Sequence, residues 1–459
     1  MKYSHKGYML IRFVMENIYS FGERKEFNMI PYTRIRSQEH HIYKYDSVSV
    51  LKMASIYGAN GAGKSNLVKA LLLLKSIVAG EELPPSVGAS KFKFHPEDQK
   101  QVLAVEFIQE KIPFYYALEI SEGRILAEEL YLSGLGKKED VLLFERTSDS
   151  LRFTEEFESE EKNRILKTVL TEEFLRPERP MIRILSNRDN NYFYYVKKAF
   201  SWFQNTLTVL NPDSRPQALA HKLDTDKEFR EFAEKIMCSY HIGVTALSSE
   251  KRNVSEIAGE GQDTVFLDFI NSFRSSPNEL IRARNTQGEE LVFVKEDGEI
   301  FLKTLKMKHK GKGGLETSFS LSEESDGTVR LLDFVPAFHS LASSEKVFII
   351  DEMERSIHPL LIRELVNKFS IDTESKGQLV FTTHESHLLD LEIFRQDEIW
   401  FAEKDMNGST DLYSLSDFKV HRTLDAQKGY LTGRYGAVPF LANLRELSWH
   451  AYDTQRQAV

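Results

Sequence analysis

The segment GANGAGKS, residues 58–65, has the residue types and spacing of a loop that binds phosphate groups. Its defining positions are Gly58, Gly63, Lys64 and Ser65, in the pattern G-x-x-x-x-G-K-S. Glycines let backbone N–H groups surround a phosphate at the positive end of a helix. Lys64 would reach the β- and γ-phosphates, and the Ser65 hydroxyl would ligate Mg²⁺. The predicted nucleotide-binding residues are Gly58, Asn60, Gly61, Ala62, Gly63, Lys64, Ser65 and Asn66.

A second group of candidate residues follows the apolar run VFII in VFIIDE, residues 347–352. Four apolar residues are typical of a strand buried on both faces, and the two acids come where that strand would emerge. We predict that Asp351 holds Mg²⁺, directly or through water, and that Glu352 polarises the attacking water. An ordinary strand followed by a polar turn is the alternative, and the upstream phosphate loop disfavours it.

A third strand pattern, QLVFTTHES at residues 378–386, places His384 at its end. Ligands bind at the carboxyl ends of parallel strands, so this imidazole could contact the γ-phosphate or orient the water. A histidine that only caps a loop is the alternative. The HESH sequence does not have the H-E-x-x-H spacing of a zinc helix, so no zinc is expected.

Between these patterns, LSEESDGTVRLLDF at residues 321–334 predicts the start of a helix. Ser325, Gly327 and Thr328 would offer hydroxyls and open backbone at its N-terminus, which suits an anion. If that anion is a phosphate bound to a neighbouring subunit, the protein dimerises around ATP. The alternative is an ordinary helix N-cap.

The elements that must position these residues form three regions. The phosphate loop follows a short apolar strand and precedes a helix with apolar residues at helical spacing. Residues 1–155 are otherwise rich in alternating strands, residues 156–288 have the three-to-four spacing of a helical insert, and residues 289–459 alternate strands with helices. The expected fold is α/β, with an antiparallel β subdomain and the helical insert attached to a nucleotide-binding core.

Composition is that of an ordinary globular protein, with 41% hydrophobic and 28% charged residues among 459. No apolar run reaches the roughly 18 residues of a membrane span, and no secretory signal is evident, so the cytoplasm is expected. The single cysteine, Cys238, excludes an intrachain disulfide and paired-cysteine zinc sites.

Partner surfaces are suggested by two segments. The net charge of −9 creates no general attraction for nucleic acid, but Lys303, Lys306, Lys308, Lys310 and Lys312 lie in one stretch with period-2 spacing. They could contact nucleic acid or simply form a solvated hairpin. Aromatic residues in YYVKKAFSWF, residues 194–203, could contact a partner protein or fill the insert's own core.

Taken in order, GANGAGKS, SDGT, VFIIDE and THES resemble the motifs of the ABC-type ATPase heads of the SMC, RecF and OLD families. IDEMERSIHPLL, TTHESHLLD, RQDEIWFAEKD and YLTGRYGAVP are similar to the AAA-family ATPase components of bacterial anti-phage operons, including the ATPase subunit of PARIS-type systems. The resemblance implies an ABC-type P-loop ATPase head that binds ATP and Mg²⁺, hydrolyses ATP and assembles into a homo-oligomer through ATP-sandwich dimers. It also implies a phage-encoded trigger protein.

The sequence departs from these families in three ways, and these differences narrow the function that the resemblance implies. SDGT lacks the adjacent glycines of a standard signature motif, and the mid-chain helices are too interrupted for a long coiled coil. Only about 60 residues follow Trp400, without the clustered acids of a C-terminal Toprim nuclease. A separate effector protein, in particular a Toprim-type nuclease, is therefore expected.

Two other functions fit the same motifs. A RecF-like or SMC-like DNA-repair ATPase would show DNA-stimulated hydrolysis, and a scaffold would use ATP only to join subunits. Which glutamine senses the γ-phosphate stays open among Gln99, Gln101 and Gln109.

Overall fold

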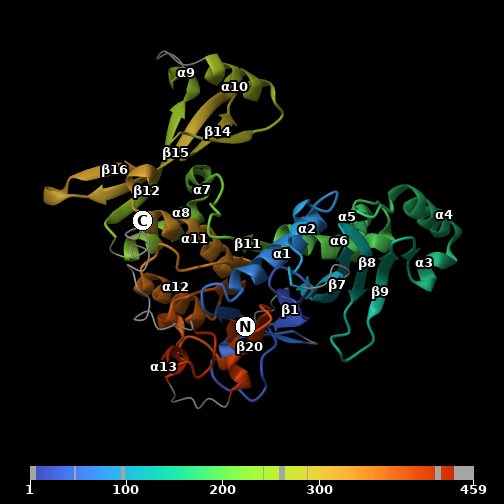
Figure 1. Cartoon of the computed structure of the whole chain (residues 1–459). Helices are drawn as coiled ribbons and strands as arrows, with labels where there is room; N and C mark the ends of the chain where they lie inside the picture. Colours follow the sequence, from blue (N-terminus) through green and yellow to red (C-terminus); the bar gives the residue numbers. More distant parts are fainter. Residues whose placement is uncertain are drawn as a thin grey trace, which may run out of the picture.

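Three large β-sheets organise the part of the chain that the structure describes (Figure 1), and the phosphate loop lies at the carboxyl ends of the parallel strands of one of them. The computed structural model describes residues 7–45, 48–94, 99–240, 242–257, 264–286, 288–418 and 425–438. The end of the predicted C-terminal region, residues 439–459, which includes Pro439 of YLTGRYGAVP, lies outside the described residues.

The six-stranded sheet carries the nucleotide motifs. Its strands, in spatial order, are β11 (Leu207–Leu210), β17 (Val347–Ile350), β18 (Gln378–Thr382), β5 (Met53–Tyr57), β19 (Ile399–Lys404) and β20 (Thr410–Ser414). The first five are mutually parallel and β20 is antiparallel. Every residue of β5, β17 and β18 is buried, which explains their continuous apolar sequences. Because β18 lies between β5 and β17, the loops after all three strands meet at one edge.

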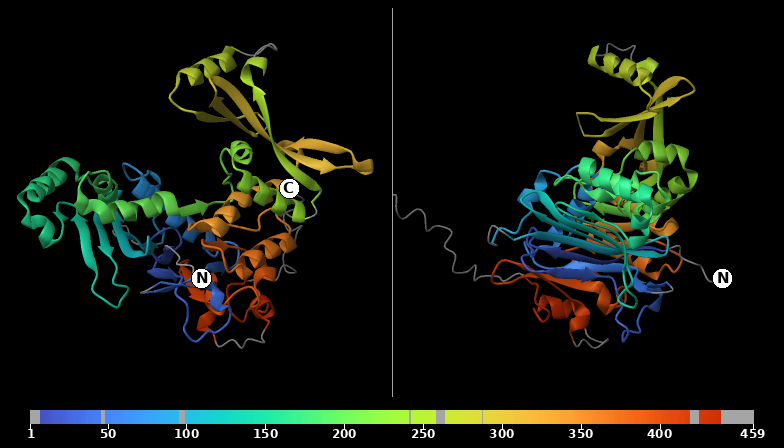
Figure 2. Two further views of the ribbon diagram at one scale, coloured as in Figure 1. Left: turned by 180° about the vertical axis from the view of Figure 1, so that it is seen from behind. Right: turned by 90° about the vertical axis from the view of Figure 1, so that its right-hand side faces the viewer.

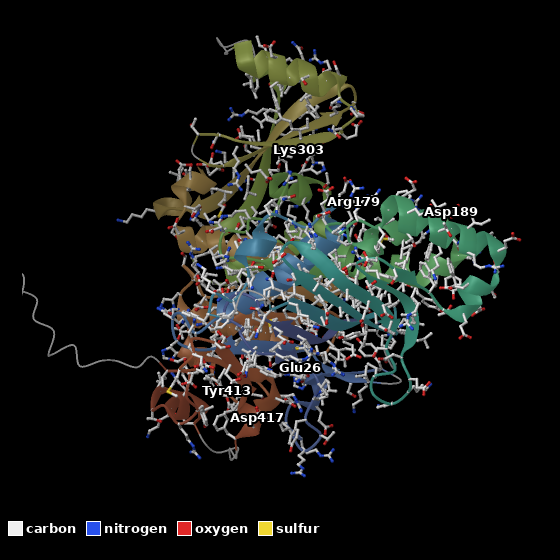
Figure 3. All side chains as sticks on the ribbon, turned by 45° about the vertical axis from the view of Figure 1, so that its right-hand side comes forward. Glu26, Arg179, Asp189, Lys303, Tyr413 and Asp417 are labelled. Carbon is white, nitrogen blue, oxygen red and sulfur yellow. The ribbon has the colours of Figure 1, made fainter. Side chains whose placement is uncertain are left out.

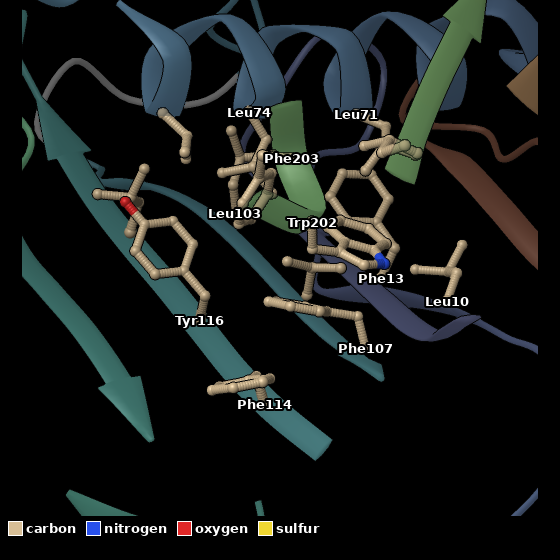
Figure 4. Close-up of a cluster of buried hydrophobic side chains, with 14 of the residues drawn as sticks. Leu10, Phe13, Leu71, Leu74, Leu103, Phe107, Phe114, Tyr116, Trp202 and Phe203 are labelled. Atoms are coloured by element: carbon tan, nitrogen blue, oxygen red, sulfur yellow. The ribbon is translucent and has the colours of Figure 1, made fainter. Parts of the chain in front are cut away.

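A seven-stranded antiparallel sheet covers one side of the helix that follows the phosphate loop. It comprises, in spatial order, β10 (Leu151–Arg152), β9 (Val141–Thr147), β8 (Arg124–Leu132), β7 (Ile112–Ser121), β6 (Gln101–Gln109), β1 (Tyr8–Glu16) and β2 (Lys25–Asn28). Leu71 and Leu74 of α1 (Lys64–Ala79) share a buried cluster with Phe107 and Trp202 (Figure 4), whose rings stack with centroids 4.3 Å apart. This apolar packing holds α1, and hence the phosphate loop, between two sheets.

Helices cover the opposite side of the parallel sheet. They are α11 (Asp326–Ser343), α12 (Pro359–Ile371) and α8 (Lys227–Ser239), which share a second buried cluster with β17, β18 and β19. The remaining elements near the core are α2 (Ser86–Ala89), α7 (Leu219–Thr225), α13 (Ala426–Leu431) and the hairpin β3 (Ile42–Lys44) with β4 (Ser49–Leu51). In the part of the chain that the structure describes, no helix combines the length and the apolar character needed to cross a membrane.

The region 156–288, expected to be helical, also contributes strands to two sheets. Its first part does form helices beyond the antiparallel sheet, namely α3 (Glu155–Ser159), α4 (Glu161–Val169), α5 (Met181–Ser186) and α6 (Tyr194–Ser201). The chain then returns to the core as β11, which pairs with β17 and forms the edge of the nucleotide-binding sheet. The predicted helical insert is therefore wrong in part. A short apolar run next to a helical pattern can form either a helix or a strand, and pairing with β17 makes this run a strand.

The aromatic segment within this insert is divided between surface and core. Tyr194 and Tyr195 are exposed, whereas Trp202 and Phe203 are fully buried against the antiparallel sheet. Trp202 and Phe203 therefore serve packing, and Tyr194 and Tyr195 are the aromatic side chains of YYVKKAFSWF that are exposed to a partner.

A second lobe projects from the core (Figures 1 and 2). It contains β12 (Val244–Asn253), β15 (Glu299–Lys310), β14 (Glu290–Glu296), β13 (Leu280–Arg284), β16 (Glu316–Ser320), α9 (Val254–Ile257) and α10 (Thr264–Ser275). A small cluster including Ile270, Phe273 and Phe293 forms its own core.

The lysines of this lobe do not share one face. Lys303, labelled in Figure 3, is buried and pairs with Asp224 at 2.6 Å and Glu296 at 2.5 Å. Lys306, Lys308 and Lys310 occupy the alternate positions of β15, on its other face, because successive side chains in a strand point to opposite sides. The five-lysine stretch thus supplies three aligned charges.

Candidate nucleotide site

Residues from three strand ends converge on one pocket of about 460 Å³. The phosphate loop follows β5, the acids follow β17 and the histidine follows β18. The residues that line the pocket are Asn60, Gly61, Gly63, Lys64, Ser65, Asn66, Glu352, Glu354, Arg355 and His384. The tertiary structure therefore brings together residues that are up to about 320 positions apart.

The phosphate loop needs its glycines for two physical reasons. Gly58, Gly61 and Gly63 all have positive φ angles, of 156°, 80° and 109°, which side-chain-bearing residues rarely adopt. In addition, a Cβ at Gly58 would overlap the Ala402 carbonyl oxygen, and one at Gly63 would overlap the Thr410 hydroxyl. The bulk of the neighbouring strands therefore enforces the loop shape.

Lys64 is buried and folded back on its own loop. Its Nζ donates to the carbonyl oxygens of Gly58 at 2.7 Å and Ala59 at 3.1 Å. Burial lowers the pKa of Lys64 to about 8, while the nearby carboxylates, Glu354 foremost, act in the opposite direction. A triphosphate would offer this ammonium stronger, charged acceptors than the two carbonyls.

Ser65 and Asp351 lie in contact at the floor of the site. The Ser65 hydroxyl donates to Asp351 Oδ1 at 3.0 Å, and the Thr382 hydroxyl donates to the same oxygen at 2.6 Å. A hydroxyl and a carboxylate beside the phosphate loop are the hard oxygen ligands that Mg²⁺ prefers, so the donor set fits this ion.

Glu352 has an unusual backbone conformation that directs it into the pocket. Its φ angle is 48°, a left-handed value that is uncommon for a non-glycine residue and concentrates at functional sites. The turn is held because the Glu352 N–H donates to the Thr382 hydroxyl at 2.8 Å. Thr382 thereby orients both acids of the IIDE motif.

His384 lies directly opposite Lys64. Its Nδ1 is 3.2 Å from Lys64 Nζ, and its backbone N–H donates to Glu354 Oε1 at 2.6 Å. Burial, together with the Lys64 charge, lowers the pKa of His384, so the imidazole is neutral at physiological pH. When Nδ1 accepts from the Lys64 ammonium, the ring proton is on Nε2, which can then donate to an anion.

The residues of the predicted signature turn lie outside this pocket. Ser325 caps α11 by accepting from the Thr328 N–H at 3.2 Å, as its position in the sequence suggested. A Cβ at Gly327 would come within 2.7 Å of the Ser356 carbonyl oxygen, so the helix start packs against the loop after β17. Neither Ser325, Gly327 nor Thr328 lines the chain's own nucleotide pocket.

A family model described as "AAA domain, putative AbiEii toxin, Type IV TA system" matches residues 53–390. This range runs from β5 through the phosphate loop and the acids of β17 to the segment after His384. The chain belongs to this AAA family. The expected α/β fold with an antiparallel β subdomain is confirmed, and in its parallel sheet β18 lies between the phosphate-loop strand and the strand that carries the acids.

Similar solved structures are SMC head domains, whereas no curated protein matches the sequence. An SMC head bound to the C-winged helix domain of ScpA shares 12% identity with a TM-score of 0.42, covering 88% of this chain and 97% of that one. The SMC head from Thermotoga maritima shares 13% with a TM-score of 0.35, covering 88% and 98%. A Pyrococcus furiosus SMC head bound to the C-terminal domain of ScpA shares 10% with a TM-score of 0.40, covering 88% and 96%.

Several residues of this AAA-family site were not predicted from the sequence. Thr382 stands inside the TTHES motif, and Glu354 and Arg355 follow the predicted acids directly, so proximity to the motifs was their only signal. Ser20 and Thr410 support the loop from behind, since the Thr410 hydroxyl lies 2.8 Å from the Ala62 carbonyl oxygen and 2.7 Å from the Ser20 hydroxyl. No local pattern connects those two positions to the phosphate loop.

None of the three candidate glutamines lines the pocket. The Gln101 side chain is buried and donates to the Ser90 hydroxyl, and Gln109 accepts from the Thr206 hydroxyl. The backbone carbonyl of Gln99 accepts from the Asn17 side chain. Gln101 and Gln109 are therefore engaged in packing the antiparallel sheet rather than in this site.

One acid of the helix α11 predicts a pH-dependent stability. Asp333 of α11 is buried against Arg215 at 2.7 Å, and burial nevertheless raises its pKa from 3.8 to about 6. The folded state thus favours the protonated carboxyl. This contributes about 3 kcal/mol to the free energy of unfolding below pH 4, and the contribution is lost as the pH rises through 6. Asp333→Asn stays neutral, so its melting temperature relative to wild type should increase between pH 4.5 and pH 7.5. A difference that is constant with pH would contradict this.

Proposed function

We propose that this chain hydrolyses ATP at the pocket between the ends of β5, β17 and β18. The observation that carries the proposal is the convergence of Lys64, Ser65, Asp351, Glu352 and His384 on one space. Each has the chemistry that phosphoryl transfer to water requires: a cation and donors for the phosphates, ligands for Mg²⁺, and a carboxylate for the water.

The residues would divide the reaction as follows. Lys64 would exchange its carbonyl acceptors for the β- and γ-phosphate oxygens, and the Nε2 proton of His384 would donate to the γ-phosphate. Glu352 would orient the attacking water and accept its proton. Mg²⁺, held by Ser65 and Asp351, would supply positive charge beside the phosphates.

The test is phosphate release by the purified full-length chain with ATP and Mg²⁺. Hydrolysis that requires Mg²⁺ supports the proposal, whereas ATP binding without turnover supports the scaffold alternative. Strong stimulation by double-stranded DNA would instead favour the DNA-repair alternative.

We also propose that two copies share each nucleotide. The support is that Ser325, Gly327 and Thr328 have the helix-start geometry of an anion site but lie outside their own pocket. A partner's triphosphate would complete the site, as in the ATP-sandwich dimers of the families that the motifs resemble. Hydrolysis should then depend on protein concentration.

Ser325→Asp tests this sharing without breaking the helix. Aspartate is as good an N-cap as serine, so stability should be kept, but its charge would repel a partner's phosphates. We expect kcat to fall about 100-fold, with ATP binding by the isolated chain unchanged. Ser325→Asn, a neutral N-cap, is the matched control and should retain activity.

Mixing Ser325→Asp with Lys64→Ala chains sharpens that test. A mixed dimer would contain one intact composite site, made from the phosphate loop of the first variant and the helix start of the second. Partial recovery of hydrolysis is expected on mixing. A mixture that stays inactive, together with hydrolysis independent of protein concentration, would rule out the shared site.

We further propose that the chain controls a separate effector in anti-phage defence. The support is the resemblance of its motifs to ATPases of such operons and a family description that includes a type IV toxin–antitoxin system. Tyr194 and Tyr195, exposed on the insert, are candidate contacts for the effector or a phage trigger. Because the family description names a putative toxin, the test is expression of this chain alone in bacteria. Normal growth of the cells supports a separate effector, and toxicity of this chain alone overturns that proposal.

A further inference from the structure

Glu354 connects the two loops that face the nucleotide pocket. It lies three residues after Asp351 in the loop following β17, and its Oε1 accepts the backbone N–H of His384, which follows β18, at 2.6 Å. Its other oxygen, Oε2, is buried without a hydrogen-bond partner among the described residues. Glu354 also lines the pocket itself.

The hydrogen bond holds the backbone N–H of the residue that carries the imidazole. The residue before it, Thr383, is fixed because its N–H donates to Ile56 of β5 at 3.0 Å. The residue after it, Glu385, donates its N–H back to the Thr383 hydroxyl at 2.9 Å. The His384 N–H crosses to the Glu354 carboxyl of the β17 loop, so this contact joins the residue that carries the imidazole to the loop that carries the acids.

The two glutamates of the β17 loop therefore have different surroundings. Glu354 is already engaged as an acceptor, and burial raises its pKa above the ordinary value. Glu352 is tied to the protein through its backbone N–H, and no side-chain hydrogen bond engages its carboxylate within the described residues. This difference leaves Glu352 available for water and commits Glu354 to the loop.

We propose that Glu354 is a positioning residue that holds His384 against the phosphate-binding Lys64 by accepting its backbone N–H. The inference rests on the proposed hydrolysis of ATP and assigns a further residue to it. A displacement of about 1 Å in a phosphate-contacting group is enough to lower a rate about 100-fold.

A double-mutant cycle on kcat and KM for ATP tests the assignment. Glu354→Ala should lower kcat about 10- to 100-fold with KM changed less than about threefold. His384→Ala should lower kcat by at least as much, and the double variant should be no slower than His384→Ala, because Glu354 acts only through the histidine. Glu354→Gln keeps a carbonyl acceptor and should retain kcat within about threefold.

The control is Glu364→Ala, which makes the same change at an exposed site on α12, outside the pocket, and should leave kcat unchanged. Effects of Glu354→Ala and His384→Ala that multiply would overturn the proposal, since a merely structural loss would be independent of the histidine. If Glu354→Ala does not fold, Glu354→Gln still decides, because a loss comparable to that of Glu352→Gln would make the carboxylate a proton acceptor instead.

Failure of this inference is distinguishable from failure of the proposed function. A wild-type chain without Glu352-dependent hydrolysis would refute the function. A wild-type chain that hydrolyses ATP, combined with additive Glu354 and His384 effects, would refute only the positioning role.

Discussion

Glu352→Gln should bind ATP with an affinity within about threefold of wild type and hydrolyse it at least about 100-fold more slowly. Glutamine has the shape of glutamate, and the hydrogen bond from the residue 352 N–H to Thr382 uses the backbone, so the left-handed turn should persist. Only the ability to accept a proton from water is lost. The bound state should therefore accumulate instead of turning over.

Single-turnover phosphate release and nucleotide-binding titrations on the same preparation separate the two effects. Glu354→Gln is the matched control, since it makes the identical change two residues away and should keep most activity. Turnover of Glu352→Gln near the wild-type rate would remove the water-orienting role from this residue.

Lys64→Ala should weaken ATP binding by at least about 100-fold, because the triphosphate loses charge-assisted hydrogen bonds that are together worth about 3 kcal/mol. The side chain is buried at the N-terminus of α1, and its ammonium contacts the loop carbonyls and His384. No other lysine lines the pocket within the described residues, so no neighbouring ammonium can replace it.

Thermal denaturation with and without ATP and Mg²⁺ measures this loss directly. Wild type should gain about 2.7 kcal/mol of stability when ATP is 100-fold above its Kd, and Lys64→Ala should gain almost none at that concentration. Lys69→Ala, at an exposed position of the same helix, is the control and should behave like wild type. Equal stabilisation of Lys64→Ala and wild type would place ATP elsewhere.

Elements with strong local patterns were predictable from the sequence. The apolar runs became β5, β17 and β18, and the three-to-four spacing after Ser65 became α1, because burial on both sides of a sheet or on one face of a helix leaves a direct mark on residue order. β11 was not predictable. Its four residues follow a helical pattern, and only pairing with β17, about 140 residues later, makes them a strand.

The positions of single side chains were also only partly predictable from the sequence, as the lysines of the second lobe show. Alternation along β15 predicted that lysines would align, but Lys303 is one residue out of phase with Lys306, Lys308 and Lys310. It is buried because Asp224 and Glu296 from other elements neutralise it. Periodicity describes one strand, and it does not say which acids the fold brings beside it.

For the site, the sequence by itself determined the chemistry that each motif could supply: a phosphate loop at residues 58–65, two acids after an apolar run and a histidine after another. These are local features, since a few consecutive residues set the loop, the strand end and the side chains there. Only the tertiary structure decided that β18 lies between β5 and β17, which places Thr382 under both acids and Glu354 against the His384 backbone. It also decided that the Ser325 helix start lies outside the pocket of its own chain. Strand order and loop-to-loop contacts depend on which surfaces pack together across hundreds of residues, and no spacing within a motif encodes that choice.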